Sequence, residues 1–250
     1  MKTLSGKNIW LIGASSGIGE TLAKELHYRG ATLILSARSE DKLAEVRKNL
    51  GGQHHILPLD VSDYEAVKKA AEVVKNQTRS IDSVINLAAI YEPTAVQDID
   101  TDFMHKTVSV NLSGMFHVVQ SVLPMMREQD YGQIALCGSV AGYRGLPNGQ
   151  PYSATKAAVI NLAESIRAEE GDKLDIKLIS PGFVETPMTD KNQFEMPMKI
   201  QPEEAAKAIA DGLTKKGFEI HFPKKFTLIM KFIRLLPASF YFALAKKLNV

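Results

Sequence analysis

Short apolar segments alternate with longer amphipathic segments along most of the 250 residues of this chain. The apolar segments predict strands at residues 8–12, 32–36, 55–59, 83–86, 132–137, 175–180 and 219–222. The amphipathic segments predict helices at residues 16–29, 41–49, 64–76, 102–127, 152–170 and 202–215. Alternating strands and helices form right-handed βαβ units, which place the strands in one parallel sheet. We therefore expect an α/β fold, a single Rossmann-type doubly wound parallel sheet with helices on both faces and a C-terminal helical extension.

The composition narrows the class of protein further. Hydrophobic residues make up 45% of the chain and charged residues 23%, which excludes a disordered or collagen-like chain. The net charge of +2 is lower than expected for a protein whose main partner is nucleic acid, so we expect no nucleic-acid partner. Cys137 is the only cysteine and cannot form an intrachain disulfide, which favours a cytoplasmic location.

Three glycines lie where the first predicted strand meets the first predicted helix. Glycines at such a junction allow a tight turn, a close approach of backbone N–H groups to a pyrophosphate, and close packing of the helix on the strand. An ordinary glycine-rich loop is the alternative. We expect a dinucleotide-binding loop made of Gly13, Ser15, Ser16, Gly17, Ile18 and Gly19.

The same segment also matches the GxSxG pattern of serine hydrolases, with Ser15 as the candidate nucleophile. That fold places its catalytic acid and histidine later in the chain. His221 is the only histidine after His117, and it lies in an apolar context near the last predicted strand. A serine hydrolase that uses Ser15 is therefore the weaker alternative function.

The residues at the end of the second predicted strand bear on the choice of dinucleotide. An NAD site usually presents a carboxylate here to the adenosine ribose, whereas a 2′-phosphate requires a cation. No carboxylate ends the strand, and Arg38 can form a bidentate pair with a phosphate. We therefore expect NADP as the preferred coenzyme and NAD as the alternative. An exposed arginine at the start of the next helix is the other explanation of Arg38.

Tyr152 and Lys156 lie four residues apart and share one face of the helix predicted from residue 152. A nearby ammonium group favours the phenolate, so we expect the pKa of Tyr152 to be lowered and its hydroxyl to act as a general acid and base. The same spacing occurs at Tyr64 and Lys68, where a polar helix indicates a solvated face. The strand predicted to end at Cys137 is followed at once by Gly138 and Ser139. Ligands of open α/β sheets bind beyond the carboxyl ends of the strands, so Ser139 and the Tyr152 helix can converge there, and Ser139 can donate a hydrogen bond to the substrate oxygen.

Several motifs, taken in order, resemble those of the short-chain dehydrogenase/reductase family. They are found at residues 13–19, 86–89, 111, 139, 152–156 and 181–182, and the resemblance covers about residues 6–222. It implies a catalytic tetrad in which Tyr152 is the acid and base, Lys156 lowers its pKa and binds the nicotinamide ribose, and Ser139 orients the carbonyl. Asn111 would hold a proton-relay water near Lys156. The further cofactor contacts that it implies are Asp60, Val61, Asn86, Ala88, Pro181, Gly182, Val184 and Thr186.

One motif departs from the family's pattern. The usual Asn-Asn-Ala-Gly after the fourth strand is Asn-Leu-Ala-Ala at residues 86–89 here. The change removes a polar contact and replaces the glycine that eases the turn, so it bears on loop geometry and coenzyme affinity.

These features predict an NADP(H)-preferring oxidoreductase that transfers a hydride between nicotinamide and a carbonyl or secondary alcohol. The substrate is expected to be small and apolar, and its identity does not follow from the sequence. A non-catalytic dinucleotide-binding scaffold or redox sensor is the alternative. The scheme needs no metal, and the HExxH pattern of a helical zinc site is absent. We expect a homodimer or homotetramer.

The last part of the chain differs in charge from the rest. Glu219 is the last acidic residue, and residues 220–250 carry Lys224, Lys225, Lys231, Arg234, Lys246 and Lys247. Apolar residues recur at helical spacing on both sides of Pro237, which predicts two short basic amphipathic helices. We expect a catalytic domain at residues 1–222 and an extension at residues 223–250. The extension either packs on the body or a second subunit, or contacts a membrane surface peripherally.

Overall fold

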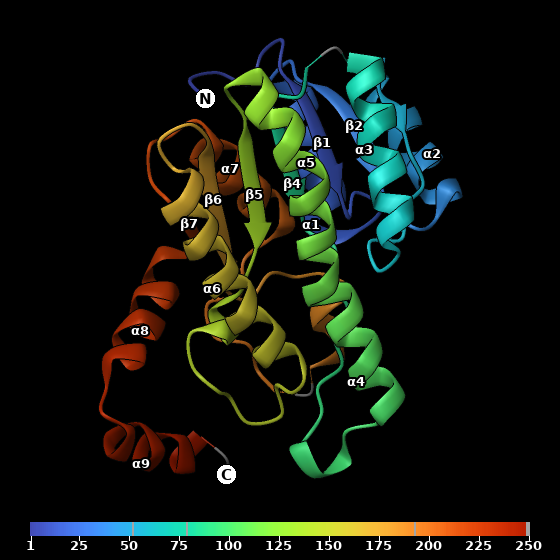
Figure 1. Cartoon of the computed structure of the whole chain (residues 1–250). Coiled ribbons are helices and arrows are strands. Elements are labelled where there is room, and N and C mark those ends of the chain that lie inside the picture. Colours follow the sequence, from blue (N-terminus) through green and yellow to red (C-terminus); the bar gives the residue numbers. More distant parts are fainter. Residues whose placement is uncertain (52, 79, 193, 249–250) are drawn as a thin grey trace.

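The computed structural model describes residues 1–51, 53–78, 80–192 and 194–248. Its strands pair in parallel in the order β3-β2-β1-β4-β5-β6-β7 (Figure 1). They are β1 (Asn8–Ile12), β2 (Thr32–Ser36), β3 (His55–Ile56), β4 (Ser83–Asn86), β5 (Gln133–Cys137), β6 (Asp175–Pro181) and β7 (Glu219–Phe222). The structure confirms the predicted fold class and the position of each strand. β5 begins one residue later than predicted, and β3 ends three residues earlier, although Leu57 and Leu59 continue to donate backbone hydrogen bonds to the segment that begins with β2.

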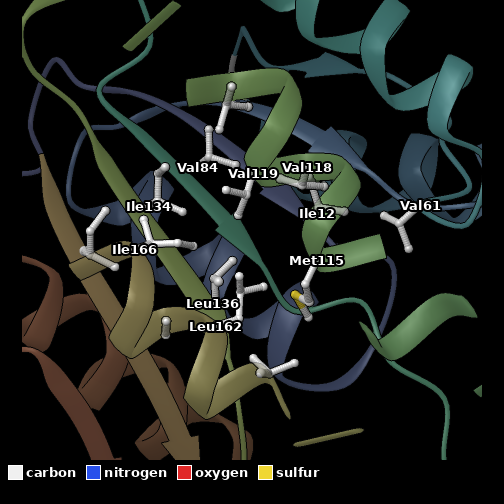
Figure 2. Packing of buried hydrophobic residues seen from close by; sticks show 14 of the residues in the cluster. Ile12, Val61, Val84, Met115, Val118, Val119, Ile134, Leu136, Leu162 and Ile166 are labelled. Atoms are coloured by element: carbon white, nitrogen blue, oxygen red, sulfur yellow. The ribbon is translucent and has the colours of Figure 1, made fainter. Parts of the chain in front are cut away.

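Helices cover both faces of this sheet. They are α1 (Gly17–Tyr28), α2 (Glu40–Leu50), α3 (Tyr64–Thr78), α4 (Thr101–Val108), α5 (Gly114–Gln129), α6 (Tyr152–Glu170) and α7 (Pro202–Leu213). Side chains of β1 alternate between two buried clusters, because successive residues of a strand point to opposite faces. Ile9 and Leu11 pack with α1, α2 and α7, whereas Trp10 and Ile12 pack with α3, α5 and α6. Figure 2 shows part of the second cluster around β4, β5 and α5.

The predicted single helix at residues 102–127 is interrupted in the structure. Between α4 and α5, the chain makes a wider π-helical turn at Ser109–Ser113, in which the N–H of Gly114 donates to the carbonyl of Ser109. Gly114 lies so close to the loop after β3 that a Cβ atom there would be 2.7 Å from Cγ2 of Val61. The wider turn also contains the buried Asn111, and π turns often occur at functional sites.

Two helices follow the last strand. They are α8 (Lys224–Leu235) and α9 (Ala238–Leu248), separated near Pro237 as the sequence predicted. Phe226 and Met230 of α8 join the buried cluster that contains α5 and α6. Within the described residues, no helix combines the length and the hydropathy needed to cross a bilayer. Residues 249 and 250 of the predicted extension lie outside the described part of the chain.

Candidate functional site

A cleft of about 390 Å³ opens beyond the carboxyl ends of the strands. It includes the junction of β1 with β4, where the strand order reverses, and ligands of open α/β sheets bind at such a point. Its lining contains most of the residues that the sequence predicted. These are Gly13, Ser15, Ser16, Gly17, Ile18, Gly19, Arg38, Asp60, Val61, Ala88, Ser139, Tyr152, Lys156, Pro181, Gly182, Val184 and Thr186. Asn86 and Asn111 are not part of the lining.

The glycine loop at residues 13–19 leaves no room for side chains at two positions. Gly13 has a φ of +87°, and a Cβ atom there would be 2.8 Å from the backbone nitrogen of Ala88. A Cβ atom on Gly19 would be 1.9 Å from the carbonyl oxygen of Gly13. Ser16 precedes α1 without capping it through its side chain, so the first N–H groups of the helix remain available to an anion. This backbone cradle fits the pyrophosphate of a dinucleotide.

Two cations line the end of the cleft near β2. Arg38 is exposed, and Lys42 in the first turn of α2 lines the same cleft. Lys42 was not among the residues predicted from the sequence, although it is a second cation only four residues after Arg38. Asp60 lies nearby and accepts hydrogen bonds from the N–H and the hydroxyl of Ser62, at 2.9 and 2.6 Å. Although burial opposes ionisation, these bonds and the charge of Arg38 keep the pKa of Asp60 below its usual value.

Ser139, Tyr152 and Lys156 meet at the other end of the cleft. Ser139 follows β5, Tyr152 begins α6, and Lys156 lies one turn further along that helix. Lys156 is 1% exposed, and its Nζ donates to the carbonyl of Cys137 at 2.7 Å. The same Nζ lies 5.4 Å from the centre of the Tyr152 ring. Ser139 and Tyr152 line the same cleft.

The predicted direction of the Tyr152 pKa shift is wrong. Burial is the largest influence and raises the pKa of Tyr152 above its usual value, although the hydrogen bond with Ser139 opposes the rise. The ammonium group of Lys156 donates to the Cys137 carbonyl, and burial lowers the pKa of Lys156 itself. Tyr152 is therefore protonated at neutral pH and can donate a proton to a ligand in the cleft.

Asn86 and Asn111 are buried next to the cleft and bond to the loop that follows β4. The Asn111 side chain accepts from the N–H of Ile90 at 2.8 Å and donates to its carbonyl at 2.9 Å. Asn86 accepts from the N–H of Ala88 at 3.1 Å, and its buried Nδ2 has no hydrogen-bond partner among the described residues. Both side chains therefore hold the loop that follows β4. The backbone partner of the Asn111 side chain, Ile90, lies 21 residues away in the sequence.

Tyr91 is a further residue at the site that the sequence analysis missed. Its ring packs edge-on against that of Tyr152, with centroids 4.9 Å apart. Its hydroxyl donates to Oδ1 of Asn192 at 2.6 Å, which connects the loop after β4 to the segment after β6. A tyrosine five residues after Asn86 was the only signal in the sequence, and nothing local showed that it would contact Tyr152.

The geometry gives no support to the serine hydrolase alternative. His221 does not line the cleft that contains Ser15, and its Nδ1 forms a 2.6 Å hydrogen bond with Oγ1 of Thr227. Ser15 therefore lacks the histidine that the hydrolase mechanism requires. Among the described residues, no group of three or more His, Cys, Asp or Glu side chains could hold a metal ion.

Comparison with known proteins identifies relatives of this chain. A family model described as short chain dehydrogenase matches residues 7–196. An uncharacterized oxidoreductase of Staphylococcus epidermidis is 32% identical over 204 residues, which cover 81% of this chain and 89% of the relative. An uncharacterized oxidoreductase of Staphylococcus aureus is 32% identical over 218 residues, covering 86% of this chain and 94% of the relative.

Solved structures of similar fold contain different dinucleotides. A short chain dehydrogenase/reductase from Burkholderia phymatum in complex with NAD has a TM-score of 0.84 at 21% identity, covering 92% of this chain and 94% of that one. An alcohol dehydrogenase from the archaeon Thermococcus sibiricus complexed with 5-hydroxy-NADP has a TM-score of 0.79 at 26% identity, covering 86% and 95%. A short chain dehydrogenase from Burkholderia cenocepacia in complex with NADP has a TM-score of 0.82 at 23% identity, covering 93% and 94%.

Proposed function

Because this chain belongs to the short-chain dehydrogenase family and is a dehydrogenase/reductase enzyme, we propose that it transfers a hydride between NADP(H) and the carbon of a carbonyl or secondary alcohol. The observation that carries the proposal is the presence of the glycine cradle and the Tyr152 phenol in one cleft. The cradle suits a pyrophosphate, and Ser139 lines the same cleft as the Tyr152 phenol. A scaffold that only binds a dinucleotide would not need the serine and the tyrosine.

The residues predicted from the sequence have the following roles in this proposal. The glycine loop and the start of α1 hold the pyrophosphate, Asp60 and Val61 contact the adenine, and Ala88 lines the cofactor site. The segment with Pro181, Gly182, Val184 and Thr186 packs on the nicotinamide end, where Lys156 binds the ribose. The bound dinucleotide supplies hydride exchange at its nicotinamide ring. Asn86 contributes by shaping the loop after β4, to which its side chain is bonded.

The chain's own groups manage the proton. As the carbonyl carbon accepts a hydride, the Tyr152 hydroxyl donates its proton to the carbonyl oxygen, and the alcohol forms. Ser139 donates a hydrogen bond that orients this oxygen. Lys156 favours the phenolate that remains, and the segment around Asn111 holds the water through which the proton is replaced. Alcohol oxidation uses the same groups in reverse.

The preference for NADP rests on Arg38, with Lys42 beside it. Replacing Arg38 with alanine should weaken NADPH binding by roughly 10- to 100-fold, because charge-assisted hydrogen bonds to the 2′-phosphate are lost. NADH binding should change little. Isothermal titration calorimetry with both dinucleotides measures the two effects. Arg47→Ala is the matched control, because Arg47 is exposed on α2, the helix that follows Arg38, but does not line the cleft. Equal weakening of NADPH and NADH would contradict the proposed preference.

The proposal extends to the setting of the enzyme. Residues 1–222 form the catalytic domain and residues 223–250 the extension, in a homodimer or homotetramer located in the cytoplasm. The single cysteine supports this location, because Cys137 is buried and has no second cysteine to pair with.

A panel of aldehydes and ketones tests the proposed reaction. The Tyr152 phenol is protonated at neutral pH, as the donation of its proton to a carbonyl oxygen requires. Purified enzyme with NADPH should consume the reduced coenzyme in the presence of an apolar carbonyl compound, as the loss of nicotinamide absorbance measures. Binding of neither NADPH nor NADH in a calorimetric titration would overturn the proposal.

A further inference from the structure

Helix α8 has apolar side chains on two opposite faces. Phe226 and Met230 are buried against the body of the protein. Large apolar residues also line the outward face, with the spacing expected for one side of a helix. They are Leu228, Ile229, Phe232 and Leu235, and all four are exposed. Phe232 is 66% and Leu235 81% exposed, so these side chains contribute little to packing within the subunit.

The neighbouring α9 continues this apolar surface. Phe240, Phe242 and Leu244 are exposed, whereas Tyr241 is buried and donates a hydrogen bond from its hydroxyl to the carbonyl of Gly145. One wall of a shallow cleft of about 400 Å³ is also formed by α9. Its other wall is formed by Leu146 and Pro147, in the loop that leads to Tyr152. The apolar surface of α9 therefore continues onto this loop.

The turn between the two helices is fixed to the body. The Arg144 guanidinium donates to the carbonyls of Arg234 and Leu236, each at 3.4 Å, and lies 4.5 Å from the centre of the Tyr241 ring. Lys231 and Glu219 form an ion pair of 2.5 Å. Figure 1 shows α8 and α9 outside the layers of the sheet and its covering helices, with α9 at the end toward which β5 points. These contacts fix α8 and the turn before α9 to the body of the protein, so the two helices present an ordered surface.

The charges around this surface have one sign. No acidic residue follows Glu219, and the only carboxylate paired with α8 is Glu219 itself among the described residues. Lys224, Lys225 and Arg234 are exposed beside the apolar face. Two copies of this chain that met symmetrically through the same surface would bring these cations together, which disfavours self-association. An anionic surface complements them.

We propose that the outward faces of α8 and α9 form a docking surface for an anionic lipid bilayer. Exposed aromatic and aliphatic side chains enter the boundary between headgroups and acyl chains, as in interfacial amphipathic helices. Lys224, Lys225 and Arg234 pair with anionic headgroups, each cation adding to the attraction. Docking needs neither coenzyme nor carbonyl substrate. An experiment can therefore contradict the docking proposal and leave the proposed reaction intact, or contradict the reaction and leave the docking proposal intact.

Vesicle cosedimentation of the full-length protein tests this docking. The protein should bind vesicles of phosphatidylcholine mixed with phosphatidylglycerol, bind vesicles of phosphatidylcholine alone much more weakly, and be released by added salt. The pair Phe232→Ser and Leu235→Ser should weaken binding by roughly tenfold or more. The pair Lys224→Glu and Lys225→Glu should weaken it on the order of 30-fold or more.

Two matched variants control for general effects of these changes. Tyr28→Ser removes an aromatic side chain that is 86% exposed on α1, and Lys68→Glu with Lys69→Glu reverses two exposed charges on α3. Both should bind vesicles as the unaltered protein does, and thermal unfolding should show that every variant is folded. Failure to bind anionic vesicles at low salt, or equal losses in test and control variants, would overturn the proposal. So would an oligomer, seen by sedimentation velocity without lipid, that the Phe232 and Leu235 changes dissociate.

Discussion

Replacing Tyr152 with phenylalanine should lower the rate of carbonyl reduction by roughly 10²- to 10⁴-fold, the range expected when a general acid is removed. The ring remains and keeps its edge-on contact with Tyr91, so the cleft should hold its shape. Dinucleotide affinity should therefore change little. Steady-state kinetics and calorimetric titration of NADPH measure the two quantities separately, and the loss should appear in kcat.

Tyr64→Phe is the matched control for this change. Tyr64 also lies four residues before a lysine at the start of a helix, but it is exposed and does not line the cleft. It should leave turnover unchanged. If Tyr152→Phe kept full activity, the proposed proton transfer would be wrong, whereas loss of NADPH binding would show that the change had damaged the cleft instead.

Replacing Gly19 with alanine should destabilise the fold by about 3 kcal/mol and abolish measurable dinucleotide binding, because the new methyl group cannot be accommodated. Its Cβ atom would lie 1.9 Å from the carbonyl oxygen of Gly13. To avoid this overlap, α1 must move away from the end of β1, and this movement opens the backbone cradle. Thermal or denaturant unfolding gives the change in stability, and titration of NADPH gives the change in affinity.

Gly217→Ala provides the comparison for this second change. Gly217 is exposed, and a Cβ atom there would meet no heavy atom within 4 Å. Alanine at this position should alter neither unfolding nor coenzyme binding. A Gly19→Ala protein that bound NADPH normally would mean that the close approach of residues 13 and 19 is not needed for the site.

The features that the sequence predicted well depend on local patterns. The periodicity of apolar residues located every strand of the sheet, and the glycines between β1 and α1 indicated the cradle before any distance was known. Ser139 and Tyr152 could be placed together because parallel strands end at one edge of the sheet, so the segments after them converge there. Arg38 was found in the same way, at the end of β2.

The features that the sequence did not predict depend on contacts between distant segments. The pKa of Tyr152 is set mainly by burial, which no spacing of residues reveals, and Lys156 bonds to a carbonyl of β5. The partner of Asn111 is Ile90, and the partner of Tyr91 is Asn192. Each pair forms only after the loops above the sheet have packed, so periodicity and motif spacing cannot supply it.

The hydrogen bond between Tyr241 and Gly145 joins the far end of the chain to the loop between Ser139 and Tyr152. Arg144, in the same loop, donates hydrogen bonds to two backbone carbonyls of the turn that precedes α9. A helix outside the cleft thus supports the loop that separates Ser139 from Tyr152, the two residues whose hydroxyls act in the proposed reaction. Removing α9, or a contact that moves α9 away from the body, would remove these hydrogen bonds from the loop between Ser139 and Tyr152. The relative position of the two hydroxyls, and with it the proposed reaction, would then change although α9 lies outside the cleft.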